Sequence, residues 1–304
     1  EFRYREPLLN KNSLFIVISQ SGETADTLEA LKIAKNARLK TLAVCNVDNS
    51  SIVRLADATV LTRAGIEKGV ASTKAFATQL RQLDLFLRFR RRHPGERQMI
   101  RGMAPDLNTA LLHVPQILNI SKEPQERIRR LAKHYLHGHG FFFIGRDIFY
   151  PLALEGALKL KEISYLHAEG YPAGEMKHGP IALLSEGYPV IAVATNSPVY
   201  DKMISNIQES RALFTVALMP QTVLYEKTKS NVEELAARDA YILAISPEEF
   251  ELSDDFIKTS KQAHPMSEFF EMMIILQLFA LEIAVRLGND VDMPRNLAKS
   301  LTVA

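Results

Sequence analysis

Short apolar runs rich in β-branched residues alternate with helical patterns along most of this chain. We expect strands over 14–19, 41–45, 58–61, 141–144, 189–194 and 241–245, and helices over 24–37, 73–90, 151–165 and 267–287. Continuous apolar strands separated by helices are typical of parallel sheets that are covered on both faces. The pattern therefore predicts an α/β fold built on doubly wound parallel sheets.

The alternation is interrupted by a polar, helical connector over residues 93–133 and then restarts. A chain of 304 residues has room for two domains at roughly 150 residues each. We expect a first domain over 1–105, a second over 106–287, and a polar tail over 288–304 after the helix stop at Gly288.

One segment of the second domain recurs 25 positions later: residues 190–209 match residues 215–234, and both copies contain Tyr-[Asp/Glu]-Lys-x-x-Ser-Asn. Convergence of two amphipathic units is the alternative, but so specific a motif favours a duplicated strand–helix unit near 190–240. We expect one copy to pair inside the sheet and the other to form an edge strand or a surface insertion. Deletion of residues 190–214 would then leave a folded protein.

Composition and charge narrow the function classes. Hydrophobic residues make up 47% and charged residues 24%, as in ordinary globular proteins, and the net charge of +2 gives no reason to expect a nucleic-acid or membrane partner. Cys45 is the only cysteine, so no disulfide can form within the chain, and a reducing compartment such as the cytoplasm fits. The start at Glu1, without methionine, indicates a processed or excised fragment.

The hydroxyl-rich segment Ser19-Gln-Ser-Gly-Glu-Thr24 lies between a predicted strand and a predicted helix. Ligands of parallel sheets meet this edge, and helix N-terminal amides there favour an anion. Capping by Ser21 or Thr24 is the alternative, but capping explains one hydroxyl and not three. The segment predicts a phosphate site. A second such turn, Gly69–Thr73, is equally explained as a capped helix start.

Charged residues on one predicted helix are candidates for chemistry. Glu155, Lys159 and Glu162 share one face of the helix over 151–165. A surface ion-pair stripe is the ordinary explanation, but the rest of this helix is small and apolar, which indicates an internal position. Burial would shift the pKa values of such groups toward neutrality.

His178 stands in the loop Gly174–Pro180, where it has no core to fill and suits acid–base work. No second histidine or cysteine stands at ligand spacing, so we predict no metal site and no cofactor. The tail from Pro294 to Ala304 is polar, and a disordered end is the default for such a segment.

Five motifs together resemble one family from the first residue to the last. They are Ser-Gln-Ser-Gly-Glu-Thr-Ala-Asp-Thr-Leu, Gly-Val-Ala-Ser-Thr-Lys-Ala-Phe, Ala-Leu-Glu-Gly-Ala-Leu-Lys-Leu-Lys-Glu-Ile-Ser-Tyr, Lys-His-Gly-Pro and Pro-Arg-Asn-Leu-Ala-Lys-Ser-Leu-Thr-Val. The chain resembles the isomerase part of the glutamine–fructose-6-phosphate aminotransferases (glucosamine-6-phosphate synthases), which has two SIS domains. Compared with that family, the first domain here lacks its N-terminal strand–helix unit, and the repeated unit is present twice and not once.

The resemblance implies a role for each matching residue. Ser19, Gln20, Ser21 and Thr24 would hold the sugar phosphate. The sugar pocket would be lined by Val70, Ser72 and Ala298. Glu162 would move a proton between C1 and C2 of the open-chain sugar, with support from Lys159. His178, contributed by a neighbouring subunit, would assist ring opening, and Lys299 would form a Schiff base with the ketose.

The leading interpretation is therefore an isomerase module that acts on fructose 6-phosphate, as a homodimer, with ammonia supplied by a glutaminase domain that lies outside this chain. The alternative is a catalytically impaired module that only binds a sugar phosphate. A third possibility, another SIS enzyme or regulator, is disfavoured by the Lys-His-Gly-Pro and Asn-Leu-Ala-Lys motifs.

Overall fold

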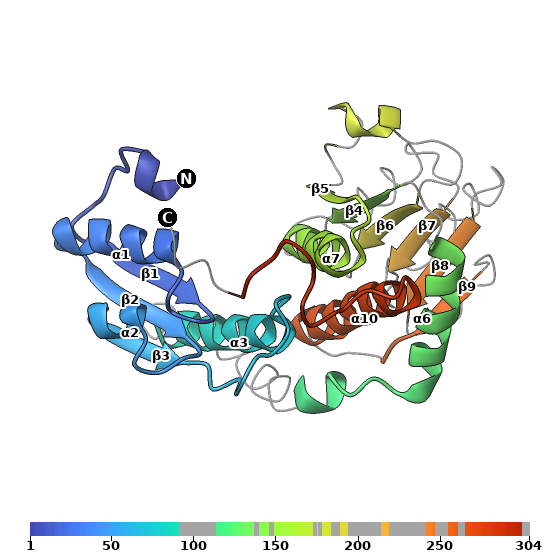
Figure 1. Cartoon of the computed structure of the whole chain (residues 1–304), viewed down its shortest axis with the longest axis horizontal. Helices are drawn as coiled ribbons and strands as arrows, with labels where there is room; N and C mark the ends of the chain where they lie inside the picture. The colour runs from blue at the N-terminus through green and yellow to red at the C-terminus, as the bar shows by residue number, and fades with distance from the viewer. Residues whose placement is uncertain are drawn as a thin grey trace, which may run out of the picture. The chain divides into compact units, whose positions relative to one another are not determined.

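The computed structural model describes residues 1–90, 114–136, 140–145, 149–172, 175, 178–183, 189–193, 214–218, 241–246, 255–260 and 265–299 (Figure 1). The chain divides into two compact units. The first combines Glu1–Met103 with the tail Asp292–Ala304, and the second is Ala104–Val291. The tail therefore belongs structurally to the first unit, although the long last helix precedes it in sequence.

The first unit is built on a parallel sheet of three strands in the order β1-β2-β3. Its elements are the short 3-10 helix η1 (Phe2–Tyr4), β1 (Leu14–Ser19), α1 (Ala25–Asn36), β2 (Lys40–Cys45), α2 (Ser51–Leu55), β3 (Ala58–Leu61) and α3 (Thr73–Arg90). Within the described residues β1 pairs with β2 alone, so β1 is an edge of this sheet.

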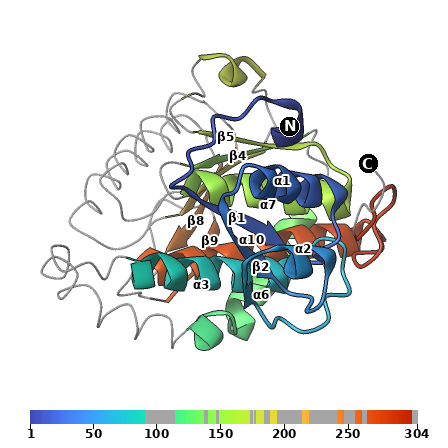
Figure 2. The same ribbon diagram turned by 90° about the vertical axis from the view of Figure 1, so that its left-hand side faces the viewer.

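Helices cover both faces of this sheet at its central strand. Val17 of β1 and Ala43 of β2 form one buried cluster with Leu31 of α1 and Ile52 of α2, so α1 and α2 share a face. In the ribbon views α1 lies along β1 (Figures 1 and 2). Strand β2 is buried from Thr41 to Cys45, and α3 contacts it. Because side chains alternate along a strand, burial of the whole run means that both faces are covered.

The second unit contains a parallel sheet of six strands in the order β5-β4-β6-β7-β8-β9. Its elements are α6 (Lys122–Tyr135), β4 (Phe141–Gly145), α7 (Phe149–Ser164), β5 (Ala168–Pro172), the 3-10 helix η3 (Pro180–Leu183), β6 (Pro189–Val193), β7 (Phe214–Leu218), β8 (Tyr241–Ser246), β9 (Asp255–Lys258) and α10 (Pro265–Arg286). The chain runs from β4 to β5 on one side and later to β6 on the other. This reversal beside β4 is the topological switch of a doubly wound sheet.

Helix α7 packs tightly in the core of the second unit. It contacts β4, β5 and α10. A Cβ atom on Gly156 would stand 2.9 Å from the Phe143 ring and 3.1 Å from Leu276 of α10, so only glycine permits this approach. The face of α7 that carries Gly156 is therefore buried in the core, whereas Leu154 and Leu158 on another face are exposed.

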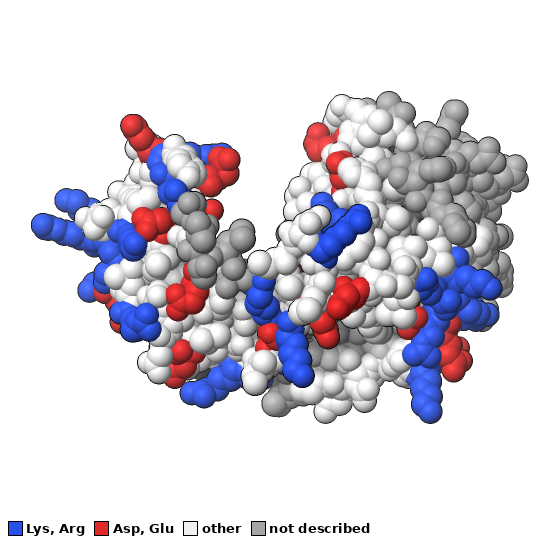
Figure 3. Space-filling model, in the orientation of Figure 1, with Lys and Arg blue, Asp and Glu red and all other residues white. Residues whose placement is uncertain are grey.

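The outer surface of α6 is basic (Figure 3). Its exposed cations are Lys122, Arg129, Arg130 and Lys133. The Arg129 Nε lies 2.9 Å from a Glu282 oxygen of α10, and the buried side of α6 carries Ile128 and Leu131. This is the ordinary division of an amphipathic helix, with the charged face in solvent.

The expectation that only one copy of the repeat lies inside the sheet is wrong. Strand β6 comes from the first copy and pairs with β4 and β7, while β7 comes from the second copy and pairs with β6 and β8. The two are interior neighbours, and their register joins Val190 to Thr215, the equivalent positions of the repeat. The helical parts of both copies lie outside the described residues.

The physical reason lies in the strands themselves. Both are short and mostly apolar on both faces, which suits an interior parallel strand better than an exposed edge. A right-handed crossover sets each new strand beside the preceding one, so two successive units extend the sheet by two strands.

A proline in either repeat strand tests this arrangement. Proline cannot donate to the ladder, and both strands pair on both sides, so Ile191→Pro and Val216→Pro should each destabilise the second unit by at least about 1–3 kcal/mol, the cost of a buried carbonyl left without its partner. Loss of cooperative thermal unfolding, followed by circular dichroism, is the expected result.

The matched control is Lys11→Pro. Lys11 follows Asn10 in a turn closed by the Ser13 N–H and the Asn10 carbonyl (2.9 Å), a position that accepts proline. If one of the two strand variants melts as the control does, that strand is not an interior strand.

Candidate functional site

The Ser19–Thr24 turn joins β1 to α1 at the carboxyl end of the sheet. The Ser19 Oγ accepts the Gly22 N–H (2.9 Å), and the Ser21 Oγ accepts the Glu23 N–H (3.2 Å). Thr24 is the N-cap of α1 and makes no side-chain cap hydrogen bond. Simple capping therefore does not account for the Thr24 hydroxyl, which stands beside the N-terminal amides of α1.

The turn is fastened to the start of α2. Gly22 has a φ of +70°, and a Cβ there would stand 2.0 Å from the Ser50 Oγ. The Gly22 carbonyl accepts the Ile52 N–H (3.0 Å), and a Glu23 Oε1 accepts the Ser51 N–H (2.8 Å). Hydrogen bonds from Ser51 hold the pKa of Glu23 below its usual value. The backbone of the turn is thus fixed by its protein contacts.

Cys45 lies beneath this turn and is buried with a free thiol. Its Sγ is 3.6 Å from the Ser50 Oγ and 3.8 Å from the carbonyl of Gln20. These contacts agree with a small buried side chain that packs under the loop.

The second hydroxyl-rich turn, Gly69–Thr73, meets the C-terminal tail. The Val70 N–H donates to the Asp292 carbonyl (3.1 Å), and the Lys299 Nζ donates to the Gly69 carbonyl (2.6 Å). Ser72 has a φ of 55°, which is uncommon for a residue other than glycine and is found preferentially at functional sites. The structure thus brings Val70, Ser72 and Lys299 together.

The tail does not behave as a free polar end over its described part. Pro294 is buried, whereas Ala298 is exposed. Burial lowers the pKa of Lys299, and the ammonium of Lys74 adds to this, while the carboxylates of Glu67 and Asp292 oppose it. A lower pKa leaves more of this amine neutral and nucleophilic.

Three charged side chains meet on α7. Lys159 is only 5% exposed, and its Nζ lies 2.7 Å from a Glu162 oxygen and 3.6 Å from Glu155 Oε1. The shorter contact is a hydrogen bond and the longer one an ion pair without one. Burial raises the pKa of Glu155 to about 7, even though the Lys159 charge opposes the shift. The surface-stripe explanation is therefore wrong for this helix.

The C-terminal end of α7 is held by the segment after α10. Asn289 Nδ2 donates to the carbonyls of Ile163 (2.9 Å) and Ser164 (3.1 Å). Asn289 thereby satisfies two carbonyls that a helix end leaves without partners. His178 is exposed, two residues before the start of η3.

The predicted site residues thus form two groups, one in each unit. The first unit holds Ser19, Gln20, Ser21, Thr24, Val70, Ser72, Ala298 and Lys299, and the second holds Lys159, Glu162 and His178. The sequence places Glu155 on the charged face of α7 but predicts no role for it, and the desolvation that raises its pKa is the feature that distinguishes it. Among the described side chains, no three His, Cys, Asp or Glu residues gather as a metal site would require.

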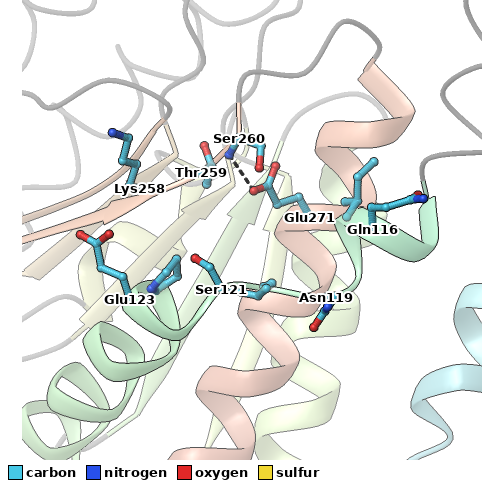
Figure 4. A pocket seen from close by; sticks show the side chains of 11 residues that line it. Gln116, Asn119, Ser121, Glu123, Lys258, Thr259, Ser260 and Glu271 are labelled. Atoms are coloured by element: carbon cyan, nitrogen blue, oxygen red, sulfur yellow. Dashed lines mark hydrogen bonds between the residues drawn. The ribbon is translucent and has the colours of Figure 1, made fainter.

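A separate cavity of about 480 Å³ lies in the second unit at the end of β9 (Figure 4). Its polar side chains come from the segment that leads into α6 and the first turn of that helix, from the end of β9 with the two residues after it, and from α10: Gln116, Asn119, Ser121, Glu123, Lys258, Thr259, Ser260 and Glu271. Glu271 is buried, and its Oε1 accepts the Ser260 N–H (2.8 Å). None of the predicted site residues lines this cavity.

Comparison with known proteins agrees with these two units. A family model described as "SIS domain" matches residues 1–88 and 134–282. The chain belongs to the SIS domain family. The C-terminal domain of glucosamine-fructose-6-phosphate aminotransferase from Francisella tularensis is 36% identical, with a TM-score of 0.74, and the match covers 96% of this chain and 76% of that one.

Two longer relatives match the whole SIS chain. Glutamine–fructose-6-phosphate aminotransferase [isomerizing] of Campylobacter jejuni is 62% identical over 303 residues, and that of Helicobacter pylori is 50% identical over 305. Each match covers 100% of this chain and 46% of the relative, so the chain spans about half of their length. The predicted fold class and the predicted resemblance are both confirmed.

The raised pKa of Glu155 predicts a pH effect on stability. A carboxyl group with a pKa of about 7 when folded and 4.5 as a model group binds its proton more tightly in the folded state. Its stabilisation is full below pH 4.5 and is lost as the pH rises through 7. Glu155→Gln should therefore flatten the fall of the unfolding free energy between pH 5 and 8, by up to about 1 kcal/mol per pH unit, as followed by denaturant unfolding at each pH.

Glu268 titrates in the same range, because burial and then the charge of Glu271 raise its pKa to about 7. The single variant should therefore reduce the slope, and Glu155→Gln with Glu268→Gln should nearly remove it. The control is Glu126→Gln on the exposed face of α6. A wild-type slope in the Glu155 variant would show that this carboxyl does not titrate with an elevated pKa.

Proposed function

We propose that this chain is the sugar-phosphate isomerase module of a glucosamine-6-phosphate synthase, which converts fructose 6-phosphate toward glucosamine 6-phosphate. The observation that carries the proposal is the buried Lys159 between Glu155 and Glu162 on an internal helix. Ions are rarely taken into a core unless they serve a site. The names of the Campylobacter jejuni and Helicobacter pylori relatives support the same chemistry.

In the proposed site the Ser19–Thr24 turn binds the phosphate. Hydroxyls of Ser19, Ser21 and Thr24, the Gln20 side chain and the amides that begin α1 form the anion site. The turn is already braced by Ser50 and Ser51, so little ordering is required on binding. Val70, Ser72 and Ala298 line the sugar.

Lys299 is the proposed covalent partner of the ketose. Its neutral amine attacks C2, a C–N bond forms, and the carbonyl oxygen leaves as water, which gives an imine. Burial favours the neutral amine by lowering the pKa of Lys299. The bond to the Gly69 carbonyl holds the amine beside Val70 and Ser72.

Glu162 is the proposed proton carrier between C1 and C2. Such a transfer needs one carboxylate that removes a proton from one carbon and returns it to the neighbouring carbon. The Lys159 ammonium, at 2.7 Å, fixes the orientation of this carboxylate. His178 assists ring opening as a residue of the neighbouring subunit in a homodimer.

The remaining parts of the proposal concern the whole protein. A glutaminase domain supplies the ammonia, in agreement with relatives about twice as long as this chain. We place the protein in the cytoplasm, which suits its free thiol at Cys45. Hexose 6-phosphate is the ligand, and no nucleic acid or membrane is involved. Over the described residues, the helices lack the combination of length and apolar character that a membrane span requires.

A module that binds sugar phosphate without turnover is the second candidate. The phosphate turn belongs to the first unit and Glu162 to the second, so loss of the acid–base group would leave the phosphate turn itself unchanged. Two experiments separate the candidates.

The first experiment measures binding. Ser21→Ala together with Thr24→Ala should abolish the heat of binding of glucosamine 6-phosphate in titration calorimetry, because two phosphate ligands are lost. The control is Ser13→Ala with Thr78→Ala, which also removes one serine and one threonine hydroxyl, but at positions outside the turn. Undiminished heat in the Ser21 and Thr24 variant would place the binding site elsewhere.

The second experiment measures chemistry. Glu162→Gln keeps an acceptor for Lys159 but cannot carry the proton, so isomerisation of fructose 6-phosphate to glucose 6-phosphate should fall by about 100-fold or more. Binding heat should be retained, and Glu126→Gln serves as the control. Wild-type isomerisation in the Glu162 variant refutes the role, while binding without any isomerisation in the unmodified chain identifies a binding module.

A further inference from the structure

Lys299 is held by one short loop of the first unit. Its Nζ donates to the Gly69 carbonyl (2.6 Å), and one residue further on the Val70 N–H donates to the Asp292 carbonyl (3.1 Å). The loop also closes on itself, since the Ser72 N–H donates to the Gly69 carbonyl (3.4 Å). The position of the amine therefore depends on what fixes this loop.

Glu67 fixes the loop to α3. Its Oε2 accepts the N–H of Ala75 in the first turn of the helix, at 2.9 Å. A carboxylate at this place pairs an amide that the helix leaves open and also meets the positive end of the helix dipole. Lys74 adds a second tie, because its Nζ donates to the Ile66 carbonyl (2.5 Å).

The same side chains set the charge around the tail amine. Glu67 and Asp292 are the two carboxylates that act on Lys299, and Lys74 is the cation that acts on it. Glu67 has the largest effect of the three. The hydrogen bond from the Ala75 N–H fixes the Glu67 carboxylate, so the negative charge stays at this position.

We propose that Glu67 is a positioning residue for Lys299: it anchors the loop that presents the Gly69 carbonyl, and its negative charge retains the protonated amine there until substrate arrives. The catalytic meaning of this role rests on the proposed Schiff base of Lys299. The geometric role does not, because it concerns only the loop, the tail and α3.

The proposal predicts opposite effects for two neutral variants. Glu67 opposes the lowering of the Lys299 pKa, so Glu67→Gln should lower that pKa further, whereas Lys74→Gln removes a repelling cation and should raise it. Glutamine at position 67 still offers an oxygen to the Ala75 N–H, so α3 should stay capped and the melting temperature unchanged. Glu67→Asp keeps the negative charge, so the pKa of Lys299 should move back toward its wild-type value.

The measurement is a titration of the complete chain after reductive ¹³C-methylation of its lysines, followed by NMR, with Lys299→Arg used to assign the signal. Glu29→Gln is the control, because Glu29 pairs with Lys32 on the exposed side of α1. The expected result is a shift to lower pH for Glu67→Gln and to higher pH for Lys74→Gln, with no shift for the control. Equal titration in all three variants overturns the proposal.

A second measurement keeps the two proposals apart. Borohydride trapping with fructose 6-phosphate, read by mass spectrometry at the Lys299 peptide, should show the pH midpoint of imine formation moving in the same two directions. If the titration shifts appear and no imine is trapped in the unmodified chain, the positioning role stands and the Schiff base of the proposed function fails. If an imine is trapped and its midpoint is the same in every variant, the positioning role fails alone.

Discussion

The close approach of α7 to β4 and α10 is the constraint on which the charge cluster of the second unit depends. Gly156 permits it, since any side chain would collide with Phe143 and Leu276. An internal α7 buries Lys159, and a buried ammonium is costly unless carboxylates compensate it. Glu162 accepts the short hydrogen bond from Lys159, whereas Glu155 lies farther from the ammonium. Burial raises the pKa of Glu155 to about 7.

Most of the sheet could be predicted from the chain, and the exceptions share a physical cause. The strands Leu14–Ser19 and Ala58–Leu61 have the predicted bounds, because each is a short, mostly apolar run rich in β-branched residues. The edge strands β5 and β9 were missed. Strand β5 contains Gly170 and ends at Pro172, and β9 begins at Asp255, all of which read as loop. The short helix α2 was missed too, because five residues carry too little helical period.

The contacts of the candidate site were predictable only in part. The Ser19–Thr24 turn is local, so its hydroxyls, glycine and flanking elements can be inferred from adjacent residues. The hydrogen bond between Lys299 and Gly69 joins positions 230 residues apart, and no pattern in either segment predicts that they meet. Burial decided the other ambiguous case, since a charged stripe on α7 looks the same in sequence whether solvent or protein faces it. The position of the repeat strands was not predictable for a related reason: similarity between two strands does not indicate whether each lies inside the sheet or at its edge.

Burial also explains why two groups of opposite charge type have shifted pKa values in the direction of their neutral forms. Loss of water penalises an ammonium and a carboxylate alike, so it lowers the pKa of Lys299 in the first unit and raises that of Glu155 in the second. In both cases desolvation is the leading cause, and a nearby opposite charge limits the shift without reversing it. Each unit thus contains a group whose neutral form is favoured by burial: Lys299, whose pKa is lowered, and Glu155, whose pKa of about 7 lies near neutral pH and whose carboxyl stands beside the Lys159 ammonium. Packing around α7 in the second unit and around the tail in the first unit excludes water from these groups, and this exclusion is what shifts their pKa values.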